Sequence, residues 1–111
     1  MKLGQYVRTD TGDLWQPKSI DKLDKGDIVL DYDFWYKESE LEFADSLLDL
    51  IKPLDLLYVD FEGIKVCRIP ETLNEVRNCR KRIESGDWKL LGITTKENIH
   101  DTMYMTKWED E

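Results

Sequence analysis

The sequence predicts an α+β fold, in the form of a small barrel or strongly curved antiparallel sheet of five to seven short strands with one or two packed helices. Three observations lead to this expectation. Short apolar stretches alternate with turn residues through most of the chain. Only two segments have a helical period. The chain has 111 residues, which suits one core, so we expect a single domain over 1–111 with a disordered tail at 108–111.

Paired apolar stretches around short turns predict two hairpins. The first turns at residues 10–12, which end in glycine, and the second turns at Glu62-Gly63, a two-residue connection typical of hairpins. Further strands are expected towards the C-terminus. The predicted strands are 4–9 with 13–17, 56–61 with 64–69, 88–95 and 102–108.

Residues 27–36, DIVLDYDFWY, alternate in a period of two and predict one continuous strand. Its buried face would carry Ile28, Leu30, Tyr32, Phe34 and Tyr36. Its exposed face would carry Val29, Asp31, Asp33 and Trp35. On such a strand Asp31 and Asp33 lie about 6.7 Å apart on one face. Trp35 would be exposed beside them.

Residues 39–53 predict an amphipathic helix. Ser39 and Glu42 have the spacing of a capping box, and Pro53 ends the run. At 100° per residue the apolar side chains cover one half of the helical wheel, and four acids form a narrow stripe opposite them. The acids of this stripe are Glu38, Glu42, Asp45 and Asp49.

A second helix is expected over residues 71–84. Pro70 suits its first turn, and Gly86 suits its end. The apolar face would carry Leu73, Val76 and Ile83. Residues 77–82, RNCRKR, suggest a nucleic-acid contact, but glutamates on the same helix dilute the positive charge and no aromatic residues are interleaved. Basic side chains near a helix C-terminus complement its dipole, so we favour a structural role.

The acidic charge is concentrated in one third of the chain. The net charge is −8, and residues 31–62 hold ten acids and two lysines, whereas acids and bases balance elsewhere. We call residues 31–62 the acidic flank. Its field disfavours direct binding to nucleic acid or to an anionic membrane and would steer a basic partner towards it. The N-terminus lacks the apolar run of a signal peptide, and no stretch is long enough for a membrane span.

No catalytic, metal or cofactor motif emerges from the sequence. His100 is the single histidine and has no evident partner for acid–base chemistry. Asp31 and Asp33 could ligate Mg²⁺, although nuclease and hydrolase sites usually combine carboxylates from separate elements. Cys67 and Cys79 lack the spacing of a redox or zinc motif, so we expect buried, inactive thiols. We therefore expect no enzyme activity and no cofactor.

Three stretches resemble small β-rich proteins of unknown function from phages and prophages of Gram-positive bacteria. They are residues 4–12 (GQYVRTDTG), 45–63 (DSLLDLIKPLDLLYVDFEG) and 93–106 (ITTKENIHDTMYMT). Leu54 stands where these proteins usually have a glycine, and the basic helix also departs from their pattern. The resemblance implies a mobile-element origin and an SH3-like barrel, and it implies no activity. A protein of this origin would act in the cytoplasm of the bacterial host.

The acidic flank suggests a protein-binding inhibitor. Like charges at i, i+4 cost a helix about 0.2–0.5 kcal/mol per pair, so a one-sign stripe needs an explanation beyond solubility. Regular carboxylates beside an exposed aromatic would imitate nucleic acid to a protein that binds phosphates. The expected partner is the basic surface of a host nucleic-acid-binding protein, such as a CRISPR effector or another defence nuclease, bound by a monomer or weak homodimer. The expected contacts are Asp31, Asp33, Trp35, Glu38, Glu42, Asp45 and Asp49. Two alternatives remain: a phage accessory or assembly protein whose acidic surface serves solubility, and a metal-dependent hydrolase using Asp31 and Asp33.

Overall fold

A computed structural model describes residues 1–99 of the chain. These residues form nine strands, arranged as three antiparallel three-stranded sheets, and one α-helix. The α+β class is therefore confirmed, while the expected number of strands, five to seven, was too low. The strand expected at 102–108 and the tail at 108–111 lie outside the described residues. No helix in the described part of the chain is both long and apolar enough to cross a membrane.

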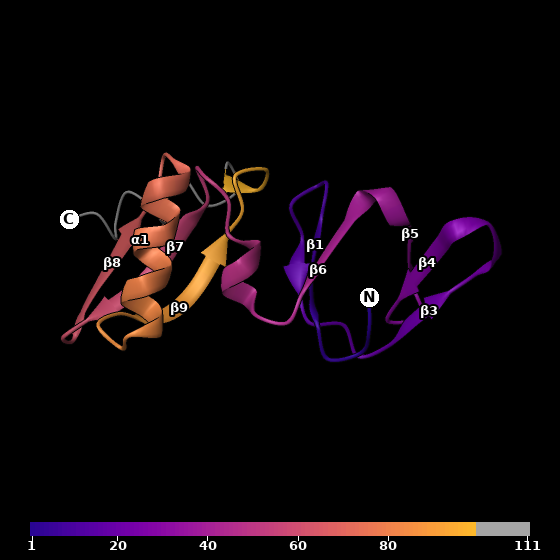
Figure 1. Ribbon diagram of the computed structural model, residues 1–111, viewed down its shortest axis with the longest axis horizontal. Coiled ribbons are helices and arrows are strands. Elements are labelled where there is room, and N and C mark those ends of the chain that lie inside the picture. Colours follow the sequence, from indigo (N-terminus) through magenta and orange to yellow (C-terminus); the bar gives the residue numbers. More distant parts are fainter. Residues whose placement is uncertain (100–111) are drawn as a thin grey trace. The chain divides into compact units, whose positions relative to one another are not determined.

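The chain forms two compact units, Met1–Leu50 and the part from Ile51 onwards (Figure 1). Each unit has its own strands and its own buried side chains. The expectation of a single domain over 1–111 stays a prediction.

The first unit contains six short strands in two sheets. The strands are β1 (Tyr6–Thr9), β2 (Leu14–Trp15), β3 (Ile20–Lys22), β4 (Asp27–Leu30), β5 (Phe34–Lys37) and β6 (Leu41–Ala44). One sheet has the order β2-β1-β6 and the other has the order β3-β4-β5. Three short 3-10 turns accompany them: η1 (Asp24–Gly26), η2 (Glu38–Glu40) and η3 (Leu47–Leu50). The hairpin between β1 and β2 is confirmed, with Gly12 at φ +94°, a conformation that glycine adopts without strain.

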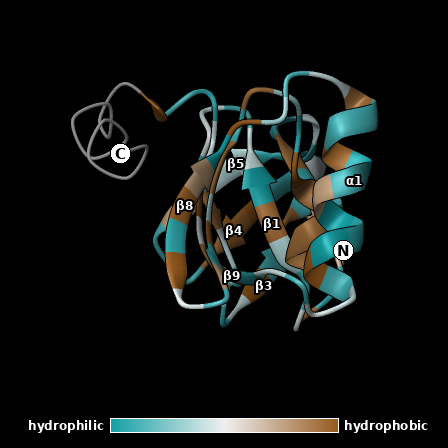
Figure 2. Cartoon of the chain, turned by 90° about the vertical axis from the view of Figure 1, so that its left-hand side faces the viewer, coloured by the Kyte–Doolittle hydropathy of each residue, from teal (hydrophilic) through white to brown (hydrophobic). Residues whose placement is uncertain are grey.

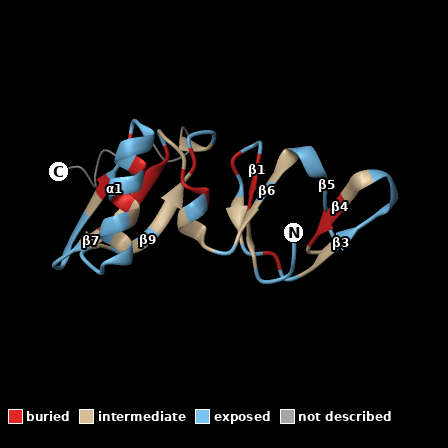
Figure 3. Ribbon diagram, in the orientation of Figure 1, coloured by how far each residue is buried: buried red, intermediate tan, exposed pale blue. Residues whose placement is uncertain are grey.

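The two sheets of the first unit share one core. Val7 of β1 and Ile28 and Leu30 of β4 are fully buried in it (Figure 3). Partly buried side chains from the other strands pack around these three: Trp15, Ile20, Tyr36, Leu41 and Phe43. Because both sheets supply buried residues, neither of them would be stable alone.

Strand β1 also carries a buried charged side chain, on the face opposite Val7. Arg8 is only 1% exposed, and its Nη1 donates a hydrogen bond to the main-chain oxygen of Leu50, 3.0 Å away. A buried guanidinium is tolerated only where acceptors replace its lost water. This bond therefore ties η3 to the first strand.

The expected strand over 27–36 was wrong, because the chain turns back on itself in the middle. Asp31 and Tyr32 have φ of 52° and 67°, and the N–H of Asp33 bonds to the oxygen of Leu30, as in a type I′ turn. Strands β4 and β5 are consequently two arms of a hairpin, with Leu30 opposite Phe34. Leu30 is buried as expected.

Side-chain burial in this hairpin differs from the expected alternation. Tyr32 is 77% exposed and Phe34 is 50% exposed, so their predicted burial was wrong. Trp35 is 64% exposed and Asp33 is exposed, as predicted. Asp31 is only half-exposed. Because it lies in the turn, the spacing of 6.7 Å expected for Asp31 and Asp33 on a strand does not apply.

The expected helix over 39–53 was also wrong. This segment contains η2, strand β6 and η3. Leu41–Ala44 pairs with β1 along its whole length, and Leu41 and Phe43 face the core while Glu42 is exposed. Apolar residues at alternate positions satisfy a strand as well as a helix, and pairing with β1 selects the strand. The acidic stripe on a helix therefore does not exist.

The second unit combines three strands with the single described helix. They are β7 (Leu56–Phe61), β8 (Ile64–Arg68), α1 (Leu73–Glu84) and β9 (Lys89–Thr94), and the sheet order is β8-β7-β9. The hairpin at Glu62-Gly63 is confirmed, with both residues at positive φ and Phe61 opposite Ile64. The strand expected at 88–95 is confirmed as β9.

Helix α1 begins at Leu73, two residues after the expected start, so Pro70 does not lie in its first turn, and it ends at Glu84 as expected. The Thr72 side chain accepts the N–H of Glu75, and Gly86, at φ +89°, follows the last turn. Hydrophilic and hydrophobic bands alternate along the helix (Figure 2). Val76 is buried as expected, whereas Leu73 is 64% exposed and was wrongly assigned to the apolar face.

Buried apolar side chains of the second unit come from α1 and from two strands. The buried members on these elements are Leu56, Leu57, Val59, Cys67, Val76 and Cys79, and Ile51 is buried ahead of β7. Both cysteines are free thiols, and burial is the main cause that raises the pKa of the Cys79 thiol. A buried thiol with a raised pKa is a poor nucleophile, in keeping with the inactive role expected for this residue.

Candidate binding site around strand β5

Strand β5 displays aromatic side chains at the edge of its sheet. It pairs with β4 on one side and is the last strand in the order β3-β4-β5. Phe34 and Trp35 are at least half exposed, on opposite faces of this strand, and Tyr32 is exposed in the preceding turn. Edge strands usually carry charged residues that discourage association. Large exposed aromatics on such an edge indicate a contact surface.

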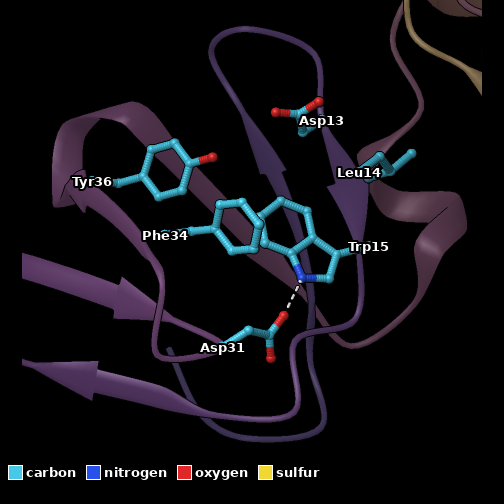
Figure 4. Close-up of a pocket in the computed structure, with 6 residues that line it drawn as sticks. All are labelled: Asp13, Leu14, Trp15, Asp31, Phe34 and Tyr36. Atoms are coloured by element: carbon cyan, nitrogen blue, oxygen red, sulfur yellow. Dashed lines mark hydrogen bonds between the residues drawn. The ribbon is translucent and has the colours of Figure 1, made fainter.

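An open pocket lies against one face of β5. Its volume is about 420 Å³, and it is lined by Asp13, Leu14, Trp15, Asp31, Phe34 and Tyr36. We call it the Trp15 pocket. The rings of Trp15 and Phe34 meet edge to face, with centroids 5.8 Å apart and an interplanar angle of 63°. Figure 4 shows Phe34 between Tyr36 and Trp15, with Asp31 and Asp13 at opposite sides of the pocket.

The carboxylate of Asp31 holds the pocket together. Its Oδ2 accepts the Trp15 indole N–H at 2.8 Å, and its Oδ1 accepts the main-chain N–H groups of Lys18 and Ser19 at 2.7 and 3.3 Å. The hydrogen bond from Trp15 is the main cause that lowers the pKa of Asp31, and the bond from Lys18 is the next. Asp31 is therefore a fixed negative charge.

The phenol of Tyr36 is surrounded by negative charge. Burial is the main cause that raises its pKa, and three carboxylates raise it further. These carboxylates belong to Asp13, Asp10 and Glu40. Such a field favours a positively charged group near Tyr36.

A second open pocket lies around Trp35. Its volume is about 260 Å³, and it is lined by Asp27, Trp35, Tyr36, Lys37 and Glu40. The carboxylate of Glu40 accepts the main-chain N–H of Lys37 at 2.7 Å, so it is held at the end of β5. Both pockets thus combine aromatic rings with acids.

The other predicted contact residues are dispersed through the first unit. Glu38 lies in η2 and forms an exposed ion pair with Lys22, with Nζ and Oε2 3.5 Å apart. Asp45 follows β6 and accepts a hydrogen bond from the Gln5 side chain at 3.1 Å. Their roles as partner contacts stay predictions.

Glu42 and Asp49 are exposed on different elements. Glu42 is on β6, opposite Arg8 in the ladder, and Asp49 is in η3. Neither of them lines the two pockets around β5. The structure therefore brings only Asp31, among the predicted acids, together with the aromatic residues in a pocket.

The hydrolase alternative has little support from the geometry of Asp31. Both of its oxygens accept hydrogen bonds, so using it as a ligand or base would break contacts that hold the turn. Within residues 1–99 no group of three His, Cys, Asp or Glu side chains could hold a metal ion. His100 lies outside the described residues.

Sequence reasoning missed four residues of the Trp15 pocket that carry its chemistry: Asp13, Trp15, Phe34 and Tyr36. Phe34 and Tyr36 were assigned to the core, and the other two to a hairpin. Residues 34–36, FWY, gave no local signal for the pocket. Alternation places only Trp35 outside, as predicted, and leaves Phe34 and Tyr36 together on the other face.

The basic residues of α1 have contacts within the second unit. The Arg82 guanidinium lies 5.1 Å from the centre of the Trp88 ring, and Arg68 of β8 lies 5.9 Å from the same ring. Arg80 donates a hydrogen bond to the main-chain oxygen of Ile51, 3.3 Å away. These contacts support the structural role that we favoured for residues 77–82.

Comparison with protein-family models, curated proteins and solved structures gave no match. The geometry of the two pockets is therefore the basis for a functional proposal.

Proposed function

We propose that this protein is a non-enzymatic, protein-binding inhibitor or modulator of mobile-element origin, which covers a basic nucleic-acid-binding surface of a host defence nuclease such as a CRISPR effector. The observation that carries the proposal is the exposure of Phe34 and Trp35 on one edge strand, next to pockets with carboxylates. Exposed aromatics of this kind supply contact area at interfaces. The acidic field selects a basic partner.

The proposed contact surface differs from the one expected on a helix. It comprises β5, the turn before it and the two pockets, with Trp35 as the central anchor. Asp33 and Glu38 flank the strand at its two ends and would contribute to attraction at the rim. Charges at the rim mainly accelerate association, whereas a central aromatic slows dissociation.

We further propose that the first unit is an SH3-like barrel. Its support is the pair of three-stranded sheets that share one core and the 3-10 turn η2 between β5 and β6. In this arrangement β5 is a rigid support for exposed aromatics, since its partner β4 is buried. Rigid supports favour binding because little freedom is lost on association.

The test is inhibition of nucleic-acid binding by purified defence nucleases. The parent protein should compete with guide RNA or target DNA. Trp35→Ala should weaken binding by roughly 2 kcal/mol or more, mainly through faster dissociation. Ile64→Ala is a matched control, because Ile64 of β8 is exposed to a similar extent, 62% against 64%, and lies outside the proposed surface.

Two results would contradict the proposal. Simultaneous binding of nucleic acid and the protein would exclude occlusion. Equal affinities of the parent and Trp35→Ala would remove β5 from the contact. The first result would favour the alternative of a phage accessory or assembly protein with a solubilising acidic surface.

A further inference from the structure

We propose that the Trp15 pocket binds the guanidinium group of an arginine side chain supplied by the partner. This inference rests on the proposed function and names the chemistry of one contact. The pocket brings three aromatic rings and two carboxylates to one place in the first unit (Figure 4). None of its six lining residues is basic.

The aromatic rings offer surfaces that attract a planar cation. The face of an aromatic ring is negative, and arginine stacks on it more readily than lysine because the guanidinium is flat and weakly hydrated. Phe34 is half exposed, and Trp15 and Tyr36 are partly buried, so each ring is supported by the core while part of it remains accessible. The indole of Trp15 is held in place by its bond to Asp31. Little freedom would be lost on binding.

The two carboxylates have different roles. Asp31 already accepts three hydrogen bonds, so it contributes negative charge rather than a free binding position. Asp13 is exposed at the other side of the pocket, and its charge affects Tyr36. An exposed carboxylate can accept two parallel bonds from a guanidinium. Asp13 is therefore the residue that would recognise the shape of the cation.

The volume also suits this ligand. An open pocket of about 420 Å³ can accommodate a guanidinium with part of its aliphatic stem. A small metal ion would need several free oxygen ligands, and those of Asp31 are engaged. A neutral apolar group would leave the charge of Asp13 without compensation on desolvation. The cation is thus favoured over both.

The test uses the whole chain and a small probe. In ¹⁵N-labelled protein, the indole N–H signal of Trp15 is followed during titration with arginine amide. Citrulline amide is the matched control, because it has nearly the same shape and no charge on its side chain. Arginine amide should shift the Trp15 signal in a saturable way, with a dissociation constant on the order of 10 mM, whereas citrulline amide should bind at least about tenfold more weakly.

Two variants locate the contact. Asp13→Asn should weaken arginine amide about two- to fivefold, as expected for one exposed charged contact. Asp24→Asn removes an equal charge from η1, away from the pocket, and should leave the affinity within experimental error. Equal shifts with the two amides, no saturable shift, or equal effects of the two variants would overturn the proposal.

The outcome separates this inference from the proposed function. Saturable binding of arginine amide by a protein that does not inhibit any nuclease would refute the proposed function and leave the chemistry of the pocket established. Inhibition that persists in Asp13→Asn, in a protein that does not bind arginine amide, would refute the arginine pocket alone.

Discussion

Replacing Asp55 with asparagine should destabilise the second unit strongly. Asp55 is fully buried, and its two oxygens accept hydrogen bonds from the main-chain N–H groups of Lys52 at 2.8 Å and of Lys96 at 2.9 Å. Lys52 precedes β7 and Lys96 follows β9, which are neighbours in the sheet. The carboxylate therefore joins the start of one strand to the end of the next.

The size of the effect follows from the chemistry of the substitution. Asparagine has the same shape but one acceptor oxygen, so its amide group would face one of the two backbone N–H groups. A hydrogen bond to a charged group contributes about 1.5–3 kcal/mol, and a buried donor left without a partner costs about 1–3 kcal/mol. We therefore expect Asp55→Asn to lower the free energy of unfolding by about 2–4 kcal/mol.

Urea denaturation followed by circular dichroism measures this loss, with a comparison of the slopes to verify that cooperativity is unchanged. Asp60→Asn is the matched control. The carboxylate of Asp60 accepts one hydrogen bond from the N–H of Gly63, at 2.8 Å, in an exposed hairpin turn. Its loss should cost less than about 1 kcal/mol. Equal stabilities of the two variants would refute the structural role assigned to Asp55.

Three further predictions concern the core, the response to acid and the thiols. Leu30→Ala should lower the free energy of unfolding by about 2–5 kcal/mol, because Leu30 is fully buried. Leu47→Ala should lower it less, because Leu47 is only partly buried in η3. A lower denaturation midpoint for Leu47→Ala than for Leu30→Ala would contradict this. The pKa of Asp31 is lower in the folded protein than its unfolded value near 3.8, so its contribution to stability is present above that pH and is lost as the pH falls through the folded pKa. Asp31→Asn should therefore reduce the loss of unfolding free energy at acidic pH. An unchanged loss at acidic pH would refute this role. Replacing Cys67 and Cys79 with alanine should leave partner binding intact, and loss of binding in a folded double variant would show that a thiol is used.

Local signals were sufficient for the two hairpins predicted at residues 10–12 and 62–63, and for the presence and the end of α1. The turn at Glu62-Gly63 and the glycine that follows α1 depend on residues within a few positions of each other, so the sequence contains the whole cause. The turn before β7 is a different case. Leu54 has φ of +73° and is half exposed. Glycine adopts this left-handed conformation without strain, and a leucine gives no local signal for it.

The break between β4 and β5 could not be predicted from alternation alone. A period of two continues through Asp31 and Tyr32, and neither is a glycine that would announce positive φ. The cause is remote in sequence, because the turn is fixed by bonds from Trp15 and Lys18 to the Asp31 carboxylate. A prediction based on residues 27–36 alone therefore buries Tyr32 and Phe34, which are exposed in the structure.

The helix predicted over residues 39–53 was wrong for a different reason. Its apolar residues satisfy both a helical period and strand alternation over Leu41–Ala44, and the ambiguity is resolved only by the free edge of β1. Without the helix, the acids of the predicted stripe no longer share a face. Glu42 is exposed on strand β6, and Asp49 lies in the separate 3-10 turn η3.

Several acids of the acidic flank have local structural roles. Asp31, Asp45, Asp55 and Asp60 each accept at least one hydrogen bond that fixes a turn or joins two segments. Short acidic side chains are common in such places because they bond to nearby backbone N–H groups. The number of acids in residues 31–62 therefore indicates a negative electrostatic field, but it does not show which residues would contact a partner.

The contact is better located where exposed rings and charge coincide. Asp13 lies outside the acidic flank and yet faces the same pocket as Phe34, because the hairpin of β1 and β2 brings it there. Exposed charges more than about 10 Å apart are screened from each other at 0.1 M salt, so in the proposed complex the flank as a whole would act mainly on the rate of encounter. A cation in the Trp15 pocket would lie much closer than this to the carboxylates, so screening would weaken their attraction less. The lifetime of a complex would therefore depend on the pocket and on Trp35, and its rate of formation on the flank.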